Sequence, residues 1–191
     1  MSRQENTREK LISLAGRMMR EHGYSAFSYA DLSAQIGISK ASIHHHFSAK
    51  ADLGAAVAQE NCAVFQAALD NIAAKHALFA ERLAAYFSLF ADTPGQLPMC
   101  AALAADKNNL PDVLKSQAEH HFELQIEWLA AIIRHAATQG ELAADIHAEE
   151  WAVFVLNAVE GAGLTAKALG RRDVFALSLQ NLLKCFKLMG A

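Results

Sequence analysis

Residues 27–53 constrain this chain more than any other stretch, because they have the pattern of two short helices joined by a tight turn. Ser28 and, three residues later, Asp31 have the spacing of a capping box at the start of the first helix. Gly37 lies where the chain must turn sharply, and a residue without a Cβ atom accepts the positive φ of such a turn. Ser39 is placed to cap the second helix. The stretch therefore predicts a helix-turn-helix that leads into a longer helix.

The second helix of this stretch combines an apolar side with a polar, outward side. The apolar residues that pin the two helices together are Leu32, Ile36, Ile38, Ile43 and Phe47. The residues left facing outward, on the second helix or just beyond it, are Lys40, Ala41, Ser42, His44, His45 and Lys50. A short hydrogen-bonding surface on a rigid helix is suited to the major groove of DNA. We therefore expect double-stranded DNA as the partner of this surface.

The rest of the chain predicts helices. Apolar residues recur at helical spacing, and no strand-like alternation, internal repeat or low-complexity tract interrupts them. We expect an all-α protein of about nine helices, those outside the helix-turn-helix lying over residues 7–22, 48–74, 76–92, 99–105, 111–138, 147–169 and 171–189. The clearest loop covers residues 93–98, with two of the three prolines.

The net charge of −3 at pH 7 is unevenly distributed along the chain. The first fifty residues hold seven Lys or Arg against four Asp or Glu, whereas the remainder holds ten against sixteen. DNA affinity depends on local phosphate contacts, so a basic excess around the helix-turn-helix matters more than the overall acidity. Ordinary scatter of surface charge would explain the same excess equally well.

The cysteines and the ends of the chain indicate a reduced, cytoplasmic protein. Cys62, Cys100 and Cys185 are widely spaced and odd in number, so we expect no disulfide framework. Cys62 and Cys185 lie on apolar helix faces, where we expect them to be buried. The polar N-terminus lacks the apolar core of a signal peptide, and uncharged stretches such as residues 151–159 are too short to cross a bilayer. We therefore expect no membrane partner.

Residues around the helix-turn-helix carry a family resemblance: Gly23-Tyr24, Ser28, Asp31-Leu32, Ile36-Gly37-Ile38-Ser39, Ala41-Ser42-Ile43, His46-Phe47, Lys50 and Leu53. In order and spacing they resemble the DNA-binding head of the TetR-type transcriptional repressors over about residues 7–55. The resemblance implies a DNA-binding head over residues 1–48 and a helical ligand-binding and dimerisation domain over residues 49–191. It also implies a homodimer, paired through its last two helices, that binds a palindromic operator and is released by a small-molecule effector. No cofactor is implied.

The same resemblance assigns roles to individual residues of the head. The residues it places against DNA are Ser28, Tyr29, Lys40, Ala41, Ser42, His44, His45, His46 and Lys50. Lys40 should face base edges, where it can donate to guanine O6 or N7, and Lys50 should contact a phosphate. His44 departs from the family, which usually has a tyrosine there whose hydroxyl contacts phosphate. A protonated His44 would gain a phosphate partner, so DNA binding should strengthen as pH falls.

An effector site in the later helices is implied in the same way. The expected lining residues are Tyr86, Phe90, Cys100, Phe122, Trp128 and Trp151, with Gln125, His121 and Asn157 as polar anchors. Small-molecule sites are mostly apolar with few polar groups, so we expect a small, largely apolar or aromatic effector. Plain core packing is the other explanation for each of these rings.

Three alternatives remain open from the sequence. Cys100 opens a helix, whose N-terminus lowers a thiol pKa, so a repressor switched by thiol oxidation or electrophiles is one of them. His44, His45 and His46 suggest a metal site, but successive helical residues point about 100° apart and cannot converge on one ion. A helical enzyme or binding module is the third, although no Ser/His/Asp order, phosphate loop or carboxylate–histidine motif supports an enzyme.

Overall fold

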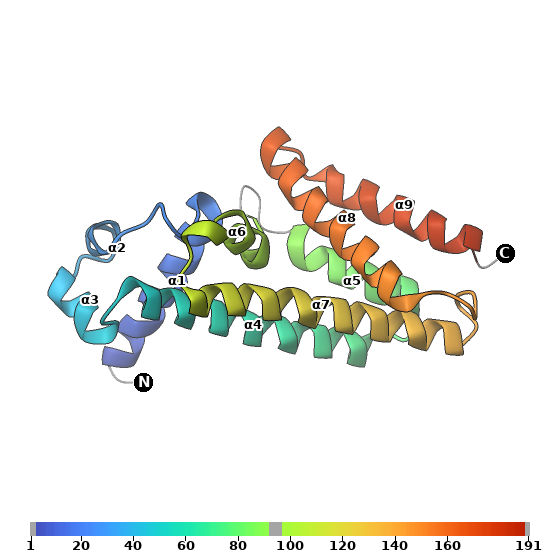
Figure 1. The fold of residues 1–191 in the computed structure, drawn as a ribbon, viewed down its shortest axis with the longest axis horizontal. Coiled ribbons are helices and arrows are strands. Elements are labelled where there is room, and N and C mark those ends of the chain that lie inside the picture. The colour runs from blue at the N-terminus through green and yellow to red at the C-terminus, as the bar shows by residue number, and fades with distance from the viewer. Residues whose placement is uncertain (1–2, 92–96, 190–191) are drawn as a thin grey trace. The chain divides into compact units, whose positions relative to one another are not determined.

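The computed structural model describes residues 3–91 and 97–189, in which every regular element is a helix (Figure 1). The first helices are α1 (Arg3–His22), α2 (Tyr29–Ile36), α3 (Lys40–His46), α4 (Lys50–Lys75) and α5 (Phe79–Ala91). They are followed by α6 (Met99–Ala105), a short 3-10 helix (Lys107–Asn109), α7 (Asp112–Thr138), α8 (Ala148–Leu169) and α9 (Asp173–Met189). The all-α prediction with about nine helices is confirmed. The loop expected over residues 93–98 falls largely outside the described residues.

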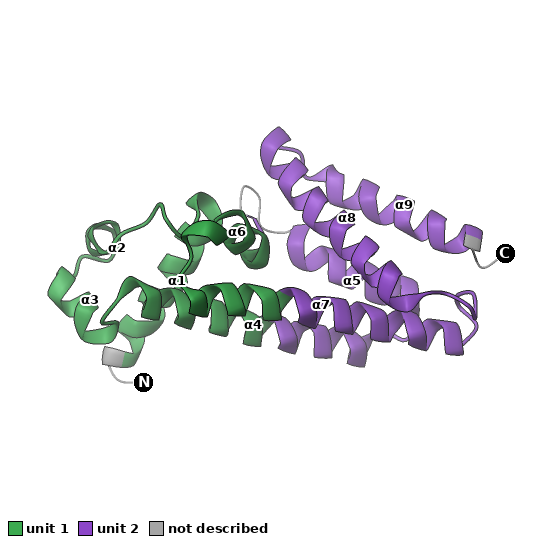
Figure 2. Ribbon diagram, in the orientation of Figure 1, with its two compact units in different colours: residues 1–64, 98–121 green, residues 65–97, 122–191 purple. Residues whose placement is uncertain are grey.

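The chain divides into two compact units (Figure 2). Unit 1 comprises residues 1–64 and 98–121, and unit 2 comprises residues 65–97 and 122–191. Both α4 and α7 run from one unit into the other. These units are defined by packing, and their bounds differ from the expected functional boundary after residue 48. That functional boundary stays a prediction.

Unit 1 has a closed hydrophobic core to which α1, α2, α3, α6 and the first parts of α4 and α7 contribute. Its fully buried side chains include Leu11, Met19, Phe27, Leu32, Ile43, Leu53 and Leu114. Gly54 lets α4 approach its neighbours closely, since a Cβ atom there would lie 2.9 Å from Leu114 Cδ1 and 2.9 Å from Tyr24 Cε2. Helix α3 is thus fixed on a well-packed support through Ile43 and Phe47.

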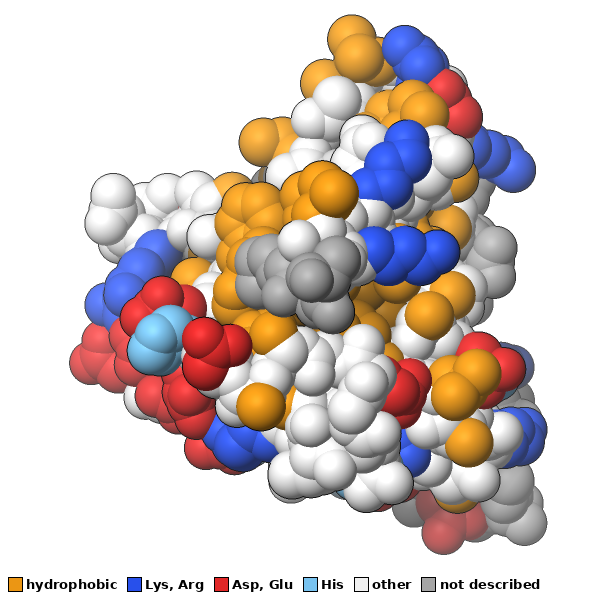
Figure 3. Space-filling model, turned by 90° about the vertical axis from the view of Figure 1, so that its right-hand side faces the viewer, with side chains coloured by type: hydrophobic (Ala, Val, Ile, Leu, Met, Phe, Trp, Pro, Cys, Tyr) orange, Lys and Arg blue, Asp and Glu red, His pale blue; other side chains and the backbone are white. Residues whose placement is uncertain are grey.

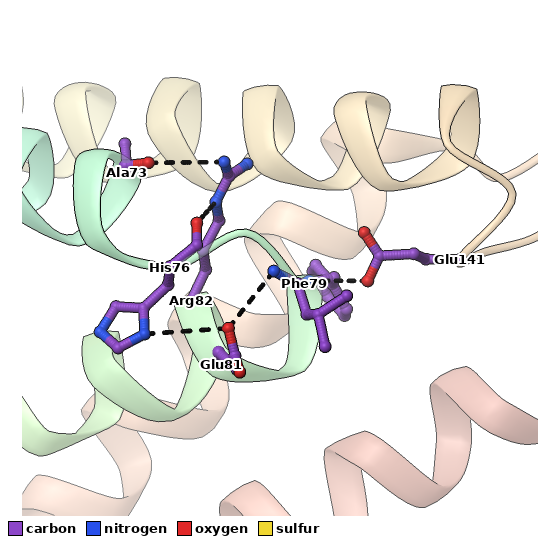
Figure 4. Close-up of polar contacts among 7 residues, drawn as sticks. Ala73, His76, Phe79, Glu81, Arg82 and Glu141 are labelled. Carbon is purple, nitrogen blue, oxygen red and sulfur yellow. Dashed lines mark hydrogen bonds and ion pairs between the residues drawn. The ribbon is translucent and has the colours of Figure 1, made fainter.

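Unit 2 is organised around α5, α8 and α9, with the later parts of α4 and α7. Its α4–α5 turn is fixed by side chains that satisfy the free backbone groups of helix ends (Figure 4). Arg82 Nε donates to the carbonyl oxygen of His76 at 2.9 Å, and Arg82 Nη2 donates to that of Ala73 at 3.5 Å. The backbone N–H of Phe79 donates to Glu141 Oε2 at 2.8 Å. The turn explains why α5 begins at Phe79 and not at the expected residue 76.

Helix α8 has one face in the core of unit 2 and an apolar face outside it. Its buried residues include Ala152, Val155, Leu156, Val159 and Ala162. The large hydrophobic side chains that α8 and α9 leave exposed are Val153, Phe154, Leu164, Leu169, Leu177 and Leu188. Figure 3 shows one face on which hydrophobic side chains gather beside Lys and Arg. By length and composition alone α8 could also cross a membrane, contrary to our expectation, although packing of one face into a helical core explains its apolar character.

Candidate nucleic-acid interface

The start of α2 forms the capping box that the sequence predicts. The backbone N–H of Ser28 donates to Asp31 Oδ2 at 2.8 Å, and the backbone N–H of Asp31 donates to Ser28 Oγ at 3.4 Å. The Ser28 hydroxyl donates to the same carboxylate at 2.7 Å, so it is already engaged within the head. Gly37 ends α2 with a φ of 75°, in the left-handed conformation expected for the turn.

Helix α3 presents the predicted polar surface. The backbone N–H of Ser42 donates to Ser39 Oγ at 3.1 Å, which caps the helix as expected. Ile43 lies in the core on the opposite side of α3. Of the residues on the outward side, four are exposed, namely Lys40, Ala41, His44 and His45. Two are half-buried, namely Ser42 and His46. The structure therefore brings these six together on one short helix, and their contacts with DNA stay predictions.

The end of α3 holds the side chain of Tyr29. Its hydroxyl donates to the carbonyl oxygen of Phe47 at 3.0 Å, and its ring meets that of His44 edge-on at 4.8 Å. Burial, with the nearby Asp52 carboxylate adding to it, raises the pKa of Tyr29 to about 12. The Tyr29 hydroxyl thus joins α2 to α3 in this structure.

His44 is oriented by a backbone carbonyl. Its Nδ1 atom lies 3.1 Å from the carbonyl oxygen of Ser48, a distance that requires a proton on Nδ1. In the neutral ring Nε2 then carries a lone pair and can only accept a hydrogen bond. A phosphate oxygen offers no proton, so neutral His44 in this orientation has nothing to donate to it, whereas the imidazolium has an Nε2–H donor and a positive charge.

This geometry gives a physical reason for the expected pH dependence of DNA binding. Protonation of His44 adds a donor and a charge on each head, so affinity should rise as pH falls. Between pH 8 and pH 6, at constant ionic strength, we expect an increase of about tenfold. Fluorescence anisotropy of the protein with labelled operator DNA measures it. His44→Gln, matched in size and unable to ionise, should show a clearly smaller increase; an equal increase in this variant would assign the effect to His45 or His46.

Lys50 does not extend freely into solvent. Its Nζ atom lies 4.5 Å from the ring centroid of Tyr24 and 4.5 Å from that of Phe27, a cation–π arrangement. It also donates to the carbonyl oxygen of Ser25 at 3.5 Å. Burial lowers the pKa of Lys50, while Asp106 and Asp31 oppose that effect. The lysine expected to contact phosphate is thus engaged inside the head.

Two arginines of α1 lie against the helix-turn-helix. The guanidinium carbon of Arg8 lies 5.2 Å from the centroid of the Phe47 ring. Arg17 donates to Gln35 Oε1 of α2 at 3.3 Å.

Carboxylates make the stability of the head depend on pH. The side-chain hydrogen bond from Ser28, followed by the Ser28 backbone N–H, lowers the pKa of Asp31. A carboxyl whose pKa is lower in the folded than in the unfolded state stabilises the folded state at pH values above its unfolded-state pKa. This contribution is lost as the pH falls through the folded-state pKa. Asp31→Asn should therefore lower stability against urea at pH 7, and the difference from the unchanged protein should shrink towards pH 3. Asp145→Asn, at an exposed loop carboxylate, serves as control; a difference for Asp31→Asn that is independent of pH would contradict the account.

The residues expected to line an effector site are only partly brought together. In unit 2, the Tyr86 hydroxyl donates to buried Gln125 Oε1 at 2.7 Å, and Trp128 stacks on the Tyr86 ring at 5.6 Å. Phe90 contacts the Tyr86 ring, and Phe65 of α4, which was not among the expected residues, joins the same cluster. Gln125 was expected as a polar anchor.

The other expected effector residues lie elsewhere. Trp151 belongs to a second aromatic group with Phe154 and Phe186, at centroid distances of 5.3 and 4.7 Å. Phe122 is half-buried against the core of unit 2. Cys100 is 1% exposed and lies in unit 1. Of the thiols expected to be buried, Cys185 is exposed and Cys62 half-buried, since both lie on helix sides that the core covers incompletely.

A groove of about 190 Å³ lies within unit 1. Residues of α1, α4 and α6 line it: Ile12, Ser13, Gly16, Arg20, Val57, Glu60, Asn61, Val64 and Met99. None of the expected effector residues contributes to it. Within the described part of the chain, no three His, Cys, Asp or Glu side chains are grouped as metal ligands would be.

Comparisons with known proteins agree with this geometry. Residues 11–57 match the family described as "Bacterial regulatory proteins, tetR family", and residues 80–182, more than half of the chain, match "Tetracyclin repressor-like, C-terminal domain". A TetR-family transcriptional regulator from Agrobacterium tumefaciens is 28% identical, with a TM-score of 0.91 over 96% of this chain and 98% of that one. A TetR transcriptional regulator from Legionella pneumophila is 27% identical, with a TM-score of 0.85 over 95% and 97%. No curated protein sequence matches this chain.

Fold and head together define a helix-turn-helix transcriptional regulator. The chain belongs to the TetR family.

Proposed function

We propose that the protein is a repressor that binds a two-fold symmetric DNA operator as a homodimer and is released by a small, mostly apolar effector. The observation that carries the proposal is the exposed polar surface of α3, with Lys40 at its start, on a helix that Ser39 caps and Ile43 anchors. A rigid helix of this kind can present donors to base edges without a large cost in conformational entropy.

The exposed apolar faces of α8 and α9 support dimerisation through the last two helices. A homodimer with two-fold symmetry uses the same surface of each subunit, and helical bundles pack such apolar stripes together. A dimer places two copies of α3 on one side of the DNA, which accounts for a two-fold operator with half-sites about 34 Å apart.

The cluster of Phe65, Tyr86, Phe90 and Trp128 around the Tyr86–Gln125 hydrogen bond supports an apolar effector. Four rings around one polar pair offer stacking surface and one point of hydrogen bonding, as small-molecule sites commonly do. An effector that binds the conformation with a different head spacing more tightly would shift the population away from the DNA-bound state. The thiol-switched alternative has no support from Cys100, because a buried thiol is shielded from oxidants and electrophiles.

The effector part of the proposal is tested on preformed complexes with operator DNA. A panel of uncharged aromatic and aliphatic compounds is screened for those that raise the melting temperature of the free protein. Those compounds should lower its affinity for DNA, and Tyr86→Phe should weaken their effect. Compounds that bind and stabilise the protein but leave its DNA affinity unchanged would contradict the proposal.

A further inference from the structure

The turn between α1 and α2 is held by a residue that lies far away in the sequence. Asp106, directly after α6, accepts the backbone N–H of Ser25 on Oδ2 at 2.7 Å, over a separation of 81 residues. Its Oδ1 accepts from Asn109 Nδ2 at 2.9 Å, which fixes the carboxylate plane. Gly23, with a φ of 90°, turns the chain beside Asp106, since a Cβ atom there would lie 3.6 Å from Oδ2. All these residues belong to unit 1.

The same turn holds the ammonium group of Lys50. Tyr24 and Phe27, on either side of Ser25, supply the two rings over which Lys50 Nζ lies, and the Ser25 carbonyl accepts from it. Ser25 is therefore bonded on both sides, to Asp106 through its N–H and to Lys50 through its carbonyl. These contacts form a continuous connection from the end of α6, through the turn, to the first residue of α4.

Charged groups stabilise this connection between Asp106, the turn and Lys50. Burial alone would raise the pKa of Asp106, but the hydrogen bonds from Asn109 and Ser25, together with the Lys50 ammonium, lower it. Hydrogen bonds to an ionised carboxylate are about twice as strong as those between neutral groups. The turn is thus held by a charge-assisted hydrogen bond, which breaks when its donor and acceptor separate by little more than an ångström.

We propose that Asp106 is a positioning residue for DNA binding, which holds the α1–α2 turn, and through it Lys50 and the start of α2, in the arrangement that fits DNA. This inference rests on the proposed function. It gives α6 a direct connection to the head: a displacement of α6 breaks the Asp106–Ser25 hydrogen bond and releases the turn that carries the Lys50 contacts. Asp106 acts through other residues and need not touch DNA itself.

Asp106→Asn tests the inference with almost no change in side-chain volume. Asp106 accepts two N–H groups, one on each oxygen, whereas an amide has one oxygen, so one donor must face the amide NH₂. We expect the affinity of Asp106→Asn for operator DNA to fall about tenfold, the equivalent of one charge-assisted hydrogen bond. Asp112→Asn, the same change of charge at an exposed residue of α7 paired with Lys115, should leave the affinity within twofold.

A double-mutant cycle with Lys50→Met separates positioning from a general loss of stability. Met keeps most of the Lys50 stem and removes the ammonium, so the effect of Asp106→Asn in this background should fall below threefold. Binding is measured at a temperature at which each variant is fully folded by circular dichroism.

An unchanged affinity for Asp106→Asn, or an equal loss in both backgrounds, would overturn the role of Asp106 while leaving the proposed function intact. Absence of sequence-specific DNA binding by the unchanged protein would overturn the proposed function, and this inference with it.

Discussion

Leu164→Glu is expected to convert the protein into a monomer and to lower its affinity for operator DNA at least about a hundredfold. Leu164 lies on α8 and is 61% exposed in the single chain. Val153, Asn157 and Gly161 precede it at spacings that place all four on one side of the helix. Gly161 has open space where a Cβ atom would stand, so a second helix can approach closely.

The size of this effect follows from symmetry and from desolvation. In a two-fold interface each substitution occurs twice, and a carboxylate placed there is buried without a partner at a cost of several kcal/mol. A monomer then binds one half-site only and loses the contribution of the second head. Light scattering after size exclusion gives the oligomeric state, and fluorescence anisotropy gives the DNA affinity.

Val113→Glu provides the matched control. Val113 is also an exposed apolar residue, 46% exposed, but lies in the first turn of α7, where a negative charge suits the helix dipole. This variant should behave like the unchanged protein. A dimeric Leu164→Glu variant with normal DNA affinity would show that α8 is not part of the dimer interface.

Lys40→Ala is expected to lower operator affinity and to relax the base preference at one position in each half-site. A lysine that donates to guanine O6 or N7 contributes about 1–3 kcal/mol of discrimination, and a dimer loses this contribution twice. Lys40 is exposed at the first position of α3.

Base preference is the measurement that separates this role from a simple loss of charge. Affinities for operator variants, each changed at one base pair, should become nearly equal at the position that Lys40 contacts. Lys75→Ala, which removes one charge from the last turn of α4, should leave every preference unchanged. If Lys40→Ala weakens all variants by the same factor, the lysine contacts phosphate and not a base.

Much of the head could be predicted from the sequence because its determinants are local. The capping pair Ser28 and Asp31, the turn glycine Gly37 and the cap Ser39 act on backbone groups within a few residues of themselves. Their spacing is sufficient to locate α2 and α3. The exposure of Ala41, His44 and His45 follows once Ile43 is assigned to the core, because they point away from Ile43 around the helix.

Contacts between distant residues explain what could not be predicted. The contact of Asp106 with Ser25 joins residues 81 positions apart, and no local pattern in the sequence predicts it. The contacts of Lys50 with the turn that Asp106 holds have no sequence signal either. Trp151 was expected to line the same effector site as Tyr86, but it packs with Phe186 of α9, a pairing that depends on how α8 and α9 cross. Aromatic residues at helical spacing predict burial, and they do not predict which rings meet.

The exposed surface of α3 is expected to read DNA sequence as part of a dimer. Selection of bound sequences from random double-stranded DNA, followed by sequencing, tests this expectation. We expect enrichment of a two-fold symmetric site whose half-sites are centred about one helical turn apart, and loss of one conserved position per half-site with Lys40→Ala. Recovery of unenriched sequences, or an enriched site that Lys40→Ala and Leu164→Glu bind as well as the unchanged protein, would contradict it.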